Sequence, residues 1–313
     1  MAAEPTMNYA RTLQILALCA CVGLASAAPT RPPLKQSLDL DTFDGLKKVT
    51  LLPSGQRLAY IDMGNPGGPP VILIHGYTDS ARDWLPLVPY LSVNYRLILV
   101  DIRGHGRSAK PECCYTLIDF AYDIKQLMDV LNISEADLIG HSLGSLISQR
   151  FAEEWPARTR RVVLISSTAG PKPCEPRKKP EFDFAAEIRK LKEPIDPESP
   201  FMIQWWASPT PVDPEFLRRQ RRDAAAIPLS VWLAVLDQGV NFEGLQQRLP
   251  RLKAKTLLIW GSKDTIMSED GRETLRAGLP TAKVKTFVGL GHNPFWENPQ
   301  AVAETINSFL DIT

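Results

Sequence analysis

The chain has 313 residues, of which 44% are hydrophobic and 23% charged, and its formal net charge at pH 7 is +1. This length and composition suit one large α/β domain with an insertion, or two smaller domains. The near-neutral charge argues against nucleic acid and acidic surfaces as partners. Beyond the N-terminal segment no stretch is apolar enough to span a bilayer, so we expect no stable membrane association.

The N-terminal segment predicts a signal peptide. Arg11 precedes an apolar run over residues 13–24, which is short for a bilayer span and ends in the small residues Ala25-Ser26-Ala27. We therefore expect residues 1–27 to be removed on secretion, and the alternative is a membrane anchor formed by residues 13–27. The Pro-rich residues 28–45 predict a flexible lead-in. Asn132, in Asn132-Ile133-Ser134, is a candidate glycosylation site.

Three cysteines remain after the predicted cleavage, namely Cys113, Cys114 and Cys174. Adjacent cysteines rarely pair with each other, because the ring that they close is strained. One of the first two is therefore a candidate to bridge to Cys174 in an oxidising compartment. No spacing of Cys and His resembles a metal site, and we expect neither a metal nor a cofactor.

Eight strand-like runs follow the lead-in, at residues 47–52, 57–63, 71–74, 96–100, 138–139, 162–165, 256–259 and 284–288. The first two flank Pro53-Ser54-Gly55-Gln56, which is a hairpin turn signal. Helical patterns lie between the later runs. The clearest covers residues 117–131 behind a Thr116–Asp119 capping box, and the last begins at Asn298-Pro299. Strands that alternate with helices predict a doubly wound, mostly parallel sheet with helices on both faces.

The alternation stops over residues 170–250, which separate a core segment at 46–169 from another at 251–313. This stretch contains no strand pattern and is rich in aromatic residues. We expect a helical lid over the carboxyl edge of the sheet, inserted after strand six, and the alternative is an ordinary helical subdomain. Trp205 and Trp206 are candidate substrate-pocket residues. Because they point about 100° apart on a helix, we expect one to face the cleft and the other to pack inside the lid.

The stretch Gly140-His141-Ser142-Leu143-Gly144 has the G-x-S-x-G pattern of a nucleophile elbow. It follows an apolar strand-like run and opens an amphipathic helical run, and this context distinguishes it from an ordinary Gly/Ser turn. The sharp turn imposes strained backbone angles on Ser142, so its neighbours must be small, and Gly140 and Gly144 provide the room. The first turn of the following helix favours developing negative charge.

Together these features resemble the α/β-hydrolase fold superfamily, across residues 46–313. The run His75-Gly76-Tyr77-Thr78 after the third strand resembles the family's oxyanion loop, and residues 101–108 resemble the loop after its fourth strand. The resemblance implies an eight-stranded sheet of the α/β-hydrolase type. It also implies that the backbone N–H groups of Leu143 and Tyr77 stabilise an oxyanion, with Gly76 letting the loop approach closely.

The resemblance assigns a triad in the family's chain order. Ser142 is the expected nucleophile and needs a base to take its proton. Of the four histidines, three lie in the oxyanion loop, the loop after strand four and the elbow, which leaves His292 after the last strand as the base. Asp264, after strand seven, stands where the family places the acid that orients this base.

These residues predict a secreted, cofactor-free serine hydrolase, similar to esterases and lactonases, that cleaves an apolar or aromatic carboxylic ester or lactone through an acyl-enzyme. Ser142 in the elbow excludes the epoxide hydrolases and haloalkane dehalogenases of the superfamily, which attack with an aspartate. One alternative is a carbon–carbon bond hydrolase or enol-lactonase with the same triad. Another is a low-turnover receptor or binding protein of the same fold.

Overall fold

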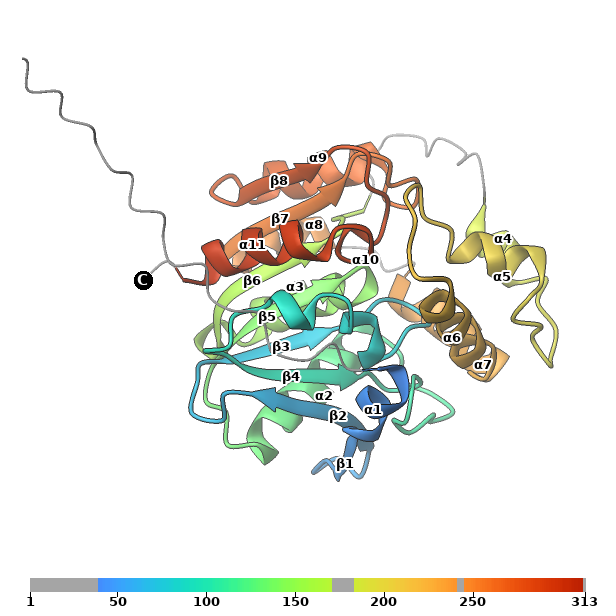
Figure 1. Ribbon diagram of the computed structural model, residues 1–313. Coiled ribbons are helices and arrows are strands. Elements are labelled where there is room, and N and C mark those ends of the chain that lie inside the picture. The colour runs from blue at the N-terminus through green and yellow to red at the C-terminus, as the bar shows by residue number, and fades with distance from the viewer. Residues whose placement is uncertain (1–38, 171–182, 241–244, 312–313) are drawn as a thin grey trace, which may run out of the picture. The chain divides into compact units, whose positions relative to one another are not determined.

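The computed structural model describes residues 39–170, 183–240 and 245–311, which all belong to one compact unit over Pro32–Thr313 (Figure 1). The predicted signal peptide, residues 28–38 of the predicted lead-in and Cys174 lie outside the described residues. Within the described residues, no helix combines the length and the apolar character needed to cross a membrane.

A single sheet of eight strands forms the centre of this unit, in the order β1-β2-β4-β3-β5-β6-β7-β8. The strands are β1 Lys48–Leu51, β2 Arg57–Gly64, β3 Pro70–Ile74, β4 Arg96–Asp101, β5 Ala136–His141, β6 Thr159–Ile165, β7 Lys255–Gly261 and β8 Lys283–Phe287. The β1–β2 and β2–β4 pairs are antiparallel and every other pair is parallel. The predicted eight-stranded, mostly parallel sheet is therefore confirmed.

Burial is greatest at the middle of the sheet. Every residue of β5 is buried, whereas the edge strands β1 and β8 are mostly exposed. The continuous apolar run of β3 suits a strand covered on both faces, and β5 beside it is buried along its whole length although it contains Asp137. The carboxyl ends of these two strands lead into the predicted oxyanion loop and the predicted elbow.

Helices cover both faces of the sheet, with α11 in front of it and α2 behind it in the view of Figure 1. The core helices are α1 Leu40–Gly45, α2 Leu117–Val130, α3 Leu143–Glu154, α9 Glu269–Gly278, α10 Pro294–Glu297 and α11 Pro299–Leu310, with 3₁₀ turns η1 Ala81–Trp84, η2 Val88–Tyr90 and η3 Pro156–Arg158. The capping box predicted at Thr116 and Asp119 is present, and the Asn298 side chain caps α11. These caps satisfy N–H groups that have no partner inside the helix.

The residues described between β6 and β7 contain helices and no strand. They are α4 Phe184–Ile188, α5 Pro200–Trp205, α6 Pro214–Ala225, α7 Leu229–Val235, the π-helix η4 Leu236–Val240, α8 Leu245–Arg248 and the 3₁₀ turn η5 Leu249–Arg251. Helices α4 to α7 lie beyond the carboxyl ends of the parallel strands (Figure 1). The Tyr77 hydroxyl donates to the Trp232 carbonyl at 2.6 Å, and Arg82 pairs with Asp223 at 2.6 Å. Both contacts fasten this insertion to the core.

Two expectations from the sequence are wrong. The predicted lead-in is not unstructured up to residue 45, because residues 40–45 form α1, which Asp39 caps and whose Phe43 is fully buried. An amphipathic turn that buries an aromatic ring gains hydrophobic stabilisation that a Pro-rich composition does not indicate. The second is the cysteine pairing, since a disulfide joins the adjacent Cys113 and Cys114.

The turn between β5 and α3 has the backbone that the elbow pattern predicts. Ser142 has φ 49° and ψ −118°, a conformation that residues with side chains rarely adopt. A Cβ on Gly140 would overlap the Gly144 carbonyl, and a Cβ on Gly144 would overlap the carbonyls of Ile74 and His75. Both glycines are therefore required because backbone atoms, which cannot easily move aside, occupy the space.

We predict that Gly144→Ala lowers the free energy of unfolding by about 1–3 kcal/mol, because the new methyl group is forced against the backbone of β3. Gly45→Ala at the end of α1 is the matched control, since nothing lies within 4 Å of its Cβ position and its effect should be close to zero. Urea denaturation measures both. Equal stability of the two variants would contradict the close packing of the elbow.

Candidate active site

Ser142 stands at the N-cap of α3, directly after the fully buried β5. Its hydroxyl does not cap the helix and makes no hydrogen bond with another described residue. The side chain instead lies on the wall of a cavity of about 80 Å³, together with His292. The elbow thus presents an unengaged hydroxyl to a cavity at the start of a helix, where the backbone N–H groups favour negative charge.

The structure brings His292 and Asp264 together. The His292 Nδ1 atom lies 3.0 Å from each carboxylate oxygen of Asp264. Burial raises the pKa of Asp264, but the His292 ring and the backbone N–H groups of Ile266 and Met267 outweigh it and hold the pKa below its usual value. Because an ionised carboxylate can only accept, Nδ1 carries the proton and the lone pair of Nε2 is left for another partner.

The walls of the cavity are mainly apolar. They are formed by Tyr77, Leu143, Leu146, Trp205, Trp206, Val240, Ile266, Met267 and Trp296, with Asp79, His141 and Asn293 as polar members beside Ser142 and His292. No Lys or Arg belongs to this set among the described residues. A volume of about 80 Å³ is roughly two to three times the share of one water molecule in the liquid, so the cavity holds a small group.

The two predicted oxyanion donors lie next to this cavity. Tyr77 and Leu143 both line it, and neither backbone N–H has a hydrogen-bond partner among the described residues. The Tyr77 phenol is held away from a substrate role by its bond to Trp232, within the buried contact between core and insertion. Gly76 is tightly enclosed, because a Cβ there would lie 2.9 Å from both His141 and Asp79.

Trp205 and Trp206 both line the cavity, so the expectation that only one of them faces it is wrong. The Trp205 indole N–H donates to Thr78 Oγ1 at 3.0 Å, and that of Trp206 approaches Asp79 Oδ1 at 3.4 Å. Trp206 stands at the C-cap of α5, where the helical spacing of side chains no longer applies. Asn132 is exposed, with a φ of 53°, and remains a candidate for glycosylation.

Two of the four histidines serve the loops around the site. His75 accepts the Ile102 N–H at Nε2, 3.1 Å away, and its Nδ1 lies 2.7 Å from the Gly76 carbonyl. His105 Nδ1 lies 2.9 Å from the Arg103 carbonyl. Burial lowers the pKa of His75 to about 3 and that of His105 to about 4, so both rings are neutral at physiological pH. They therefore act as fixed hydrogen-bonding groups that shape the loops.

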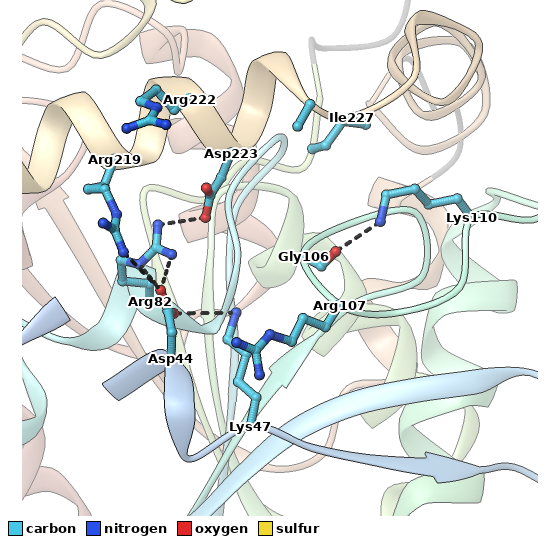
Figure 2. A pocket seen from close by; sticks show the side chains of 11 residues that line it. Asp44, Lys47, Arg82, Gly106, Arg107, Lys110, Arg219, Arg222, Asp223 and Ile227 are labelled. Carbon is cyan, nitrogen blue, oxygen red and sulfur yellow. Dashed lines mark hydrogen bonds and ion pairs between the residues drawn. The ribbon is translucent and has the colours of Figure 1, made fainter. Parts of the chain in front are cut away.

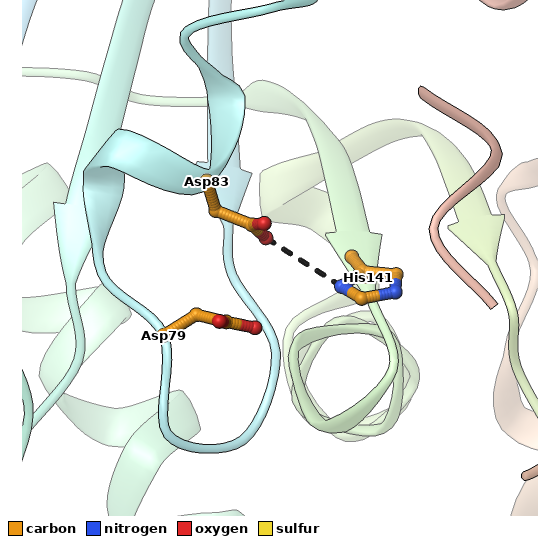
Figure 3. Close-up of side chains that lie close together, drawn as sticks. All are labelled: Asp79, Asp83 and His141. Atoms are coloured by element: carbon orange, nitrogen blue, oxygen red, sulfur yellow. Dashed lines mark ion pairs between the residues drawn. The ribbon is translucent and has the colours of Figure 1, made fainter. Parts of the chain in front are cut away.

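A buried cluster that the sequence did not indicate borders the site, formed by Asp79, Asp83 and His141 (Figure 3). The His141 Nε2 atom lies 3.1 Å from the His292 carbonyl, which also accepts from Ser166 Oγ at 2.6 Å. These contacts hold the loop that carries His292. The cluster escaped notice because Asp79 and Asp83 are 62 and 58 positions from His141 in the chain.

The proton positions in this cluster follow from its contacts. Since a carbonyl can only accept, His141 carries its proton on Nε2, and its bare Nδ1 faces Asp83 Oδ2 at 3.5 Å. Two acceptors in a dry site repel unless a proton lies between them. Burial raises the pKa of Asp83 to about 8 and that of Asp79 well above its usual value, which supplies that proton.

The same three side chains are the one group of described residues whose donor atoms, within 4.8 Å of one another, suit a metal ion. A protonated Asp83 accounts for the contact with His141 without a metal. The Trp296 indole N–H donates to the other oxygen of Asp83 at 2.8 Å and fixes its orientation. The cluster is thus a support for the His292 loop.

We predict that Asp83→Asn flattens the pH dependence of stability. Because folding raises the pKa of Asp83 to about 8, its carboxyl group is protonated in the folded protein between about pH 4 and about pH 8. In the unfolded chain the same group is ionised over this range. Stability should therefore fall as the pH rises through this window, by up to about 1.4 kcal/mol per pH unit. Urea denaturation across the window measures the slope in both proteins.

Asp196→Asn is the matched control, because Asp196 is exposed in a loop before α5. This variant should keep the slope of the parent protein. An Asp83→Asn variant with the same slope as the parent would show that Asp83 is ionised in the folded state.

Comparison with known proteins identifies the family. The chain matches the family model described as alpha/beta hydrolase fold over residues 69–243 and 241–299. It is 30% identical to a 2-hydroxy-6-oxo-6-phenylhexa-2,4-dienoate hydrolase from Burkholderia cepacia, over 84% of this chain and 96% of that protein.

Solved structures give the same result. A hydrolase from Pseudomonas aeruginosa PA01 superposes with a TM-score of 0.71 at 25% identity, over 85% of this chain and 99% of the other. A membrane phospholipase A described as a bacterial virulence factor superposes with a TM-score of 0.73 at 25% identity, over 87% and 89% of the two chains. The chain therefore belongs to the α/β hydrolase fold family and is a hydrolase of that fold.

Proposed function

We propose that this protein is a serine hydrolase that cleaves a small, neutral carboxylic ester or lactone through an acyl-enzyme. The observation that carries the proposal is that His292, paired with Asp264, lines the same cavity as the strained, unengaged Ser142. Nucleophile, base and orienting acid in this relation are the parts that acyl transfer requires.

In the proposed reaction, Ser142 attacks the carbonyl carbon while His292 Nε2 takes the hydroxyl proton. Asp264, kept ionised, stabilises the imidazolium that forms. The N–H groups of Leu143 and Tyr77 stabilise the oxyanion of the tetrahedral intermediate. His292 returns the proton to the leaving alcohol, and a water molecule activated by the same ring then releases the acid. A catalytic serine and its histidine base commonly come into closer contact when the substrate binds.

The wall chemistry supports an ester or lactone over the carbon–carbon bond alternative. The Burkholderia relative is named for a dienoate, which carries a carboxylate, whereas the described wall of this cavity contains no basic side chain. Burying an unpaired carboxylate beside such a wall would be costly. Because the relative is 30% identical over most of the chain, carbon–carbon cleavage is kept as the second candidate. Hydrolysis of an enol-lactone is supported in the same way as ester hydrolysis, by the absence of a basic side chain from the described wall.

We further propose that helices α4 to α7 act as a lid and limit substrate size. Trp205, Trp206 and Val240 come from this insertion and line the cavity. With its volume of about 80 Å³, the cavity favours a short apolar acyl group, while a longer or aromatic group requires the insertion to move.

We predict that Ser142→Ala lowers kcat by about 10⁴–10⁶-fold, because the nucleophile is lost while the fold is kept. A fluorophosphonate probe should label the parent protein at Ser142 and leave the variant unlabelled. Ser54→Ala in the β1–β2 hairpin is the control and should keep both activity and labelling. Full activity in Ser142→Ala, or labelling at another serine, would exclude the proposed mechanism.

We predict that Trp205→Ala raises the preference for hexanoate over acetate esters of p-nitrophenol by about tenfold. Each methylene that gains an apolar contact contributes about 0.8 kcal/mol, so room for one or two more gives this ratio. Trp155→Ala is the control, because Trp155 packs against Phe151 outside the cavity. An unchanged ratio of kcat/KM values for Trp205→Ala would show that the insertion does not limit acyl length.

Secretion is also part of the proposal. The small residues that end the N-terminal apolar run and the exposed sequon at Asn132 support it. We predict that secreted protein from a eukaryotic host begins near Ala28 and loses mass on endoglycosidase treatment, whereas Asn132→Gln protein does not. An intact N-terminus on membrane-bound protein would instead indicate an anchor.

A further inference from the structure

A second cavity, of about 500 Å³, lies between α6 and the core, and it shares no described residue with the cavity that contains Ser142 (Figure 2). Arg219, Arg222 and Asp223 enter it from α6. Asp44 enters it from α1, Lys47 from the turn before β1, Arg82 from η1, and Arg107 and Lys110 from the loop after β4. Its volume lies in the range of small-molecule sites.

The cavity has an excess of positive charge. Six basic side chains line it, and four carboxylates contact them, namely Asp41, Asp44, Asp101 and Asp223, which leaves two positive charges in excess. Each of these carboxylates is already engaged. Lys47 binds Asp101 at 2.9 Å, Arg82 binds Asp44 and Asp223, and Arg219 binds Asp41.

Three of the six basic side chains form no ion pair with a described carboxylate, and they give the cavity its net positive charge. Arg107 and Arg222 form no ion pair with a described carboxylate, although Glu215 of α6 attracts Arg222 at longer range. The Lys110 ammonium donates only to backbone carbonyls, to Gly106 at 2.8 Å and to Ser108 at 3.4 Å. Like charges that face one cavity raise the free energy of the empty site, and an anion that binds there relieves this repulsion.

The loop that carries Arg107 is firmly held. The Arg107 backbone N–H donates to Asp101 Oδ2 at 2.8 Å, and Gly106, with φ 50°, packs so closely on Asp101 that a Cβ would overlap the carboxylate. Asp101 is fully buried and also accepts the Ala81 N–H at 2.7 Å. Arg107 and Lys110 are thus presented from a rigid edge, which lowers the entropic cost of binding.

We propose that this cavity binds a small molecule bearing a phosphate group, held between Arg222 of α6 and Arg107 and Lys110 of the core. A phosphate monoester carries between one and a half and two negative charges near neutral pH, roughly equal to the excess of the site. The planar fork of an arginine matches its oxygens in a bidentate contact. Because such a ligand bridges α6 and the core, its binding also fastens the insertion that carries Trp205 and Trp206.

Calorimetric titration of the full chain with phenyl phosphate, at constant ionic strength, tests the proposal. We expect saturable binding, and we expect benzoate, which has the same ring but a single charge, to bind at least about tenfold more weakly. Equal binding of benzoate, or no saturable binding of any phosphate probe in solution or on vesicles, would overturn the proposal.

Variants locate the site. Arg107→Gln and Arg222→Gln should each weaken phenyl phosphate by about tenfold while leaving the melting temperature of the unliganded protein and the hydrolysis of p-nitrophenyl acetate unchanged. Arg251→Gln on η5 removes the same charge from an exposed position outside the cavity and should bind like the parent. Equal weakening in Arg251→Gln would show unspecific attraction and overturn the assignment.

Vesicles separate two sources of the phosphate group. Vesicles of phosphatidylcholine with phosphatidylinositol 4-phosphate, compared with phosphatidylcholine alone, test a lipid headgroup. Binding to these vesicles without binding of phenyl phosphate, and lost in Arg107→Gln, would assign the phosphate to a lipid. Binding of phenyl phosphate in solution assigns it to a soluble molecule. Since both measurements are independent of Ser142, they stand apart from the proposed esterase activity.

Discussion

The backbone of Ser142 is the constraint on which the site depends. A residue with a side chain at φ 49° and ψ −118° is strained by about 1–3 kcal/mol, and it persists only where the surroundings impose it. Here β5 is buried along its whole length, and α3 packs against β5 and β6. The two glycines of the elbow remove the side chains that would hold strand and helix apart. The strain is thus maintained by packing on both sides of one residue.

Around this turn, the position of His292 is determined by contacts on its backbone as well as on its ring. Its carbonyl accepts from His141 and Ser166, and its ring faces Asp264. Glu297 accepts the Gly291 N–H at 2.7 Å and the Thr210 hydroxyl at 2.6 Å, which links the same loop to the insertion. Because separate elements hold one loop, the ring has little freedom to leave the cavity wall, as a pre-organised base requires.

The insertion is attached to the core through charged contacts on one side and aromatic contacts on the other. Arg82 bridges Asp44 and Asp223 beside the basic cavity, whereas Tyr77, Trp205 and Trp232 pack edge to face near Ser142. Aromatic packing excludes water, and the ion pairs depend on the charges around them. A ligand in the basic cavity and a substrate beside Ser142 would therefore both contact the insertion, through different residues.

Local signals in the sequence determined the eight strands, the caps of α2 and α11 and the elbow around Ser142, whereas His292 and Asp264 were chosen from the resemblance to the family's chain order. The local features each depend on neighbouring residues: apolar runs, capping side chains, and small residues at a sharp turn. The fold followed because alternating strands and helices leave few possible arrangements. Only the tertiary structure decided that both tryptophans line the cavity, that Asp83 faces His141, and that basic residues from four segments surround one cavity. These features depend on distances between residues far apart in the chain, and no local pattern contains them.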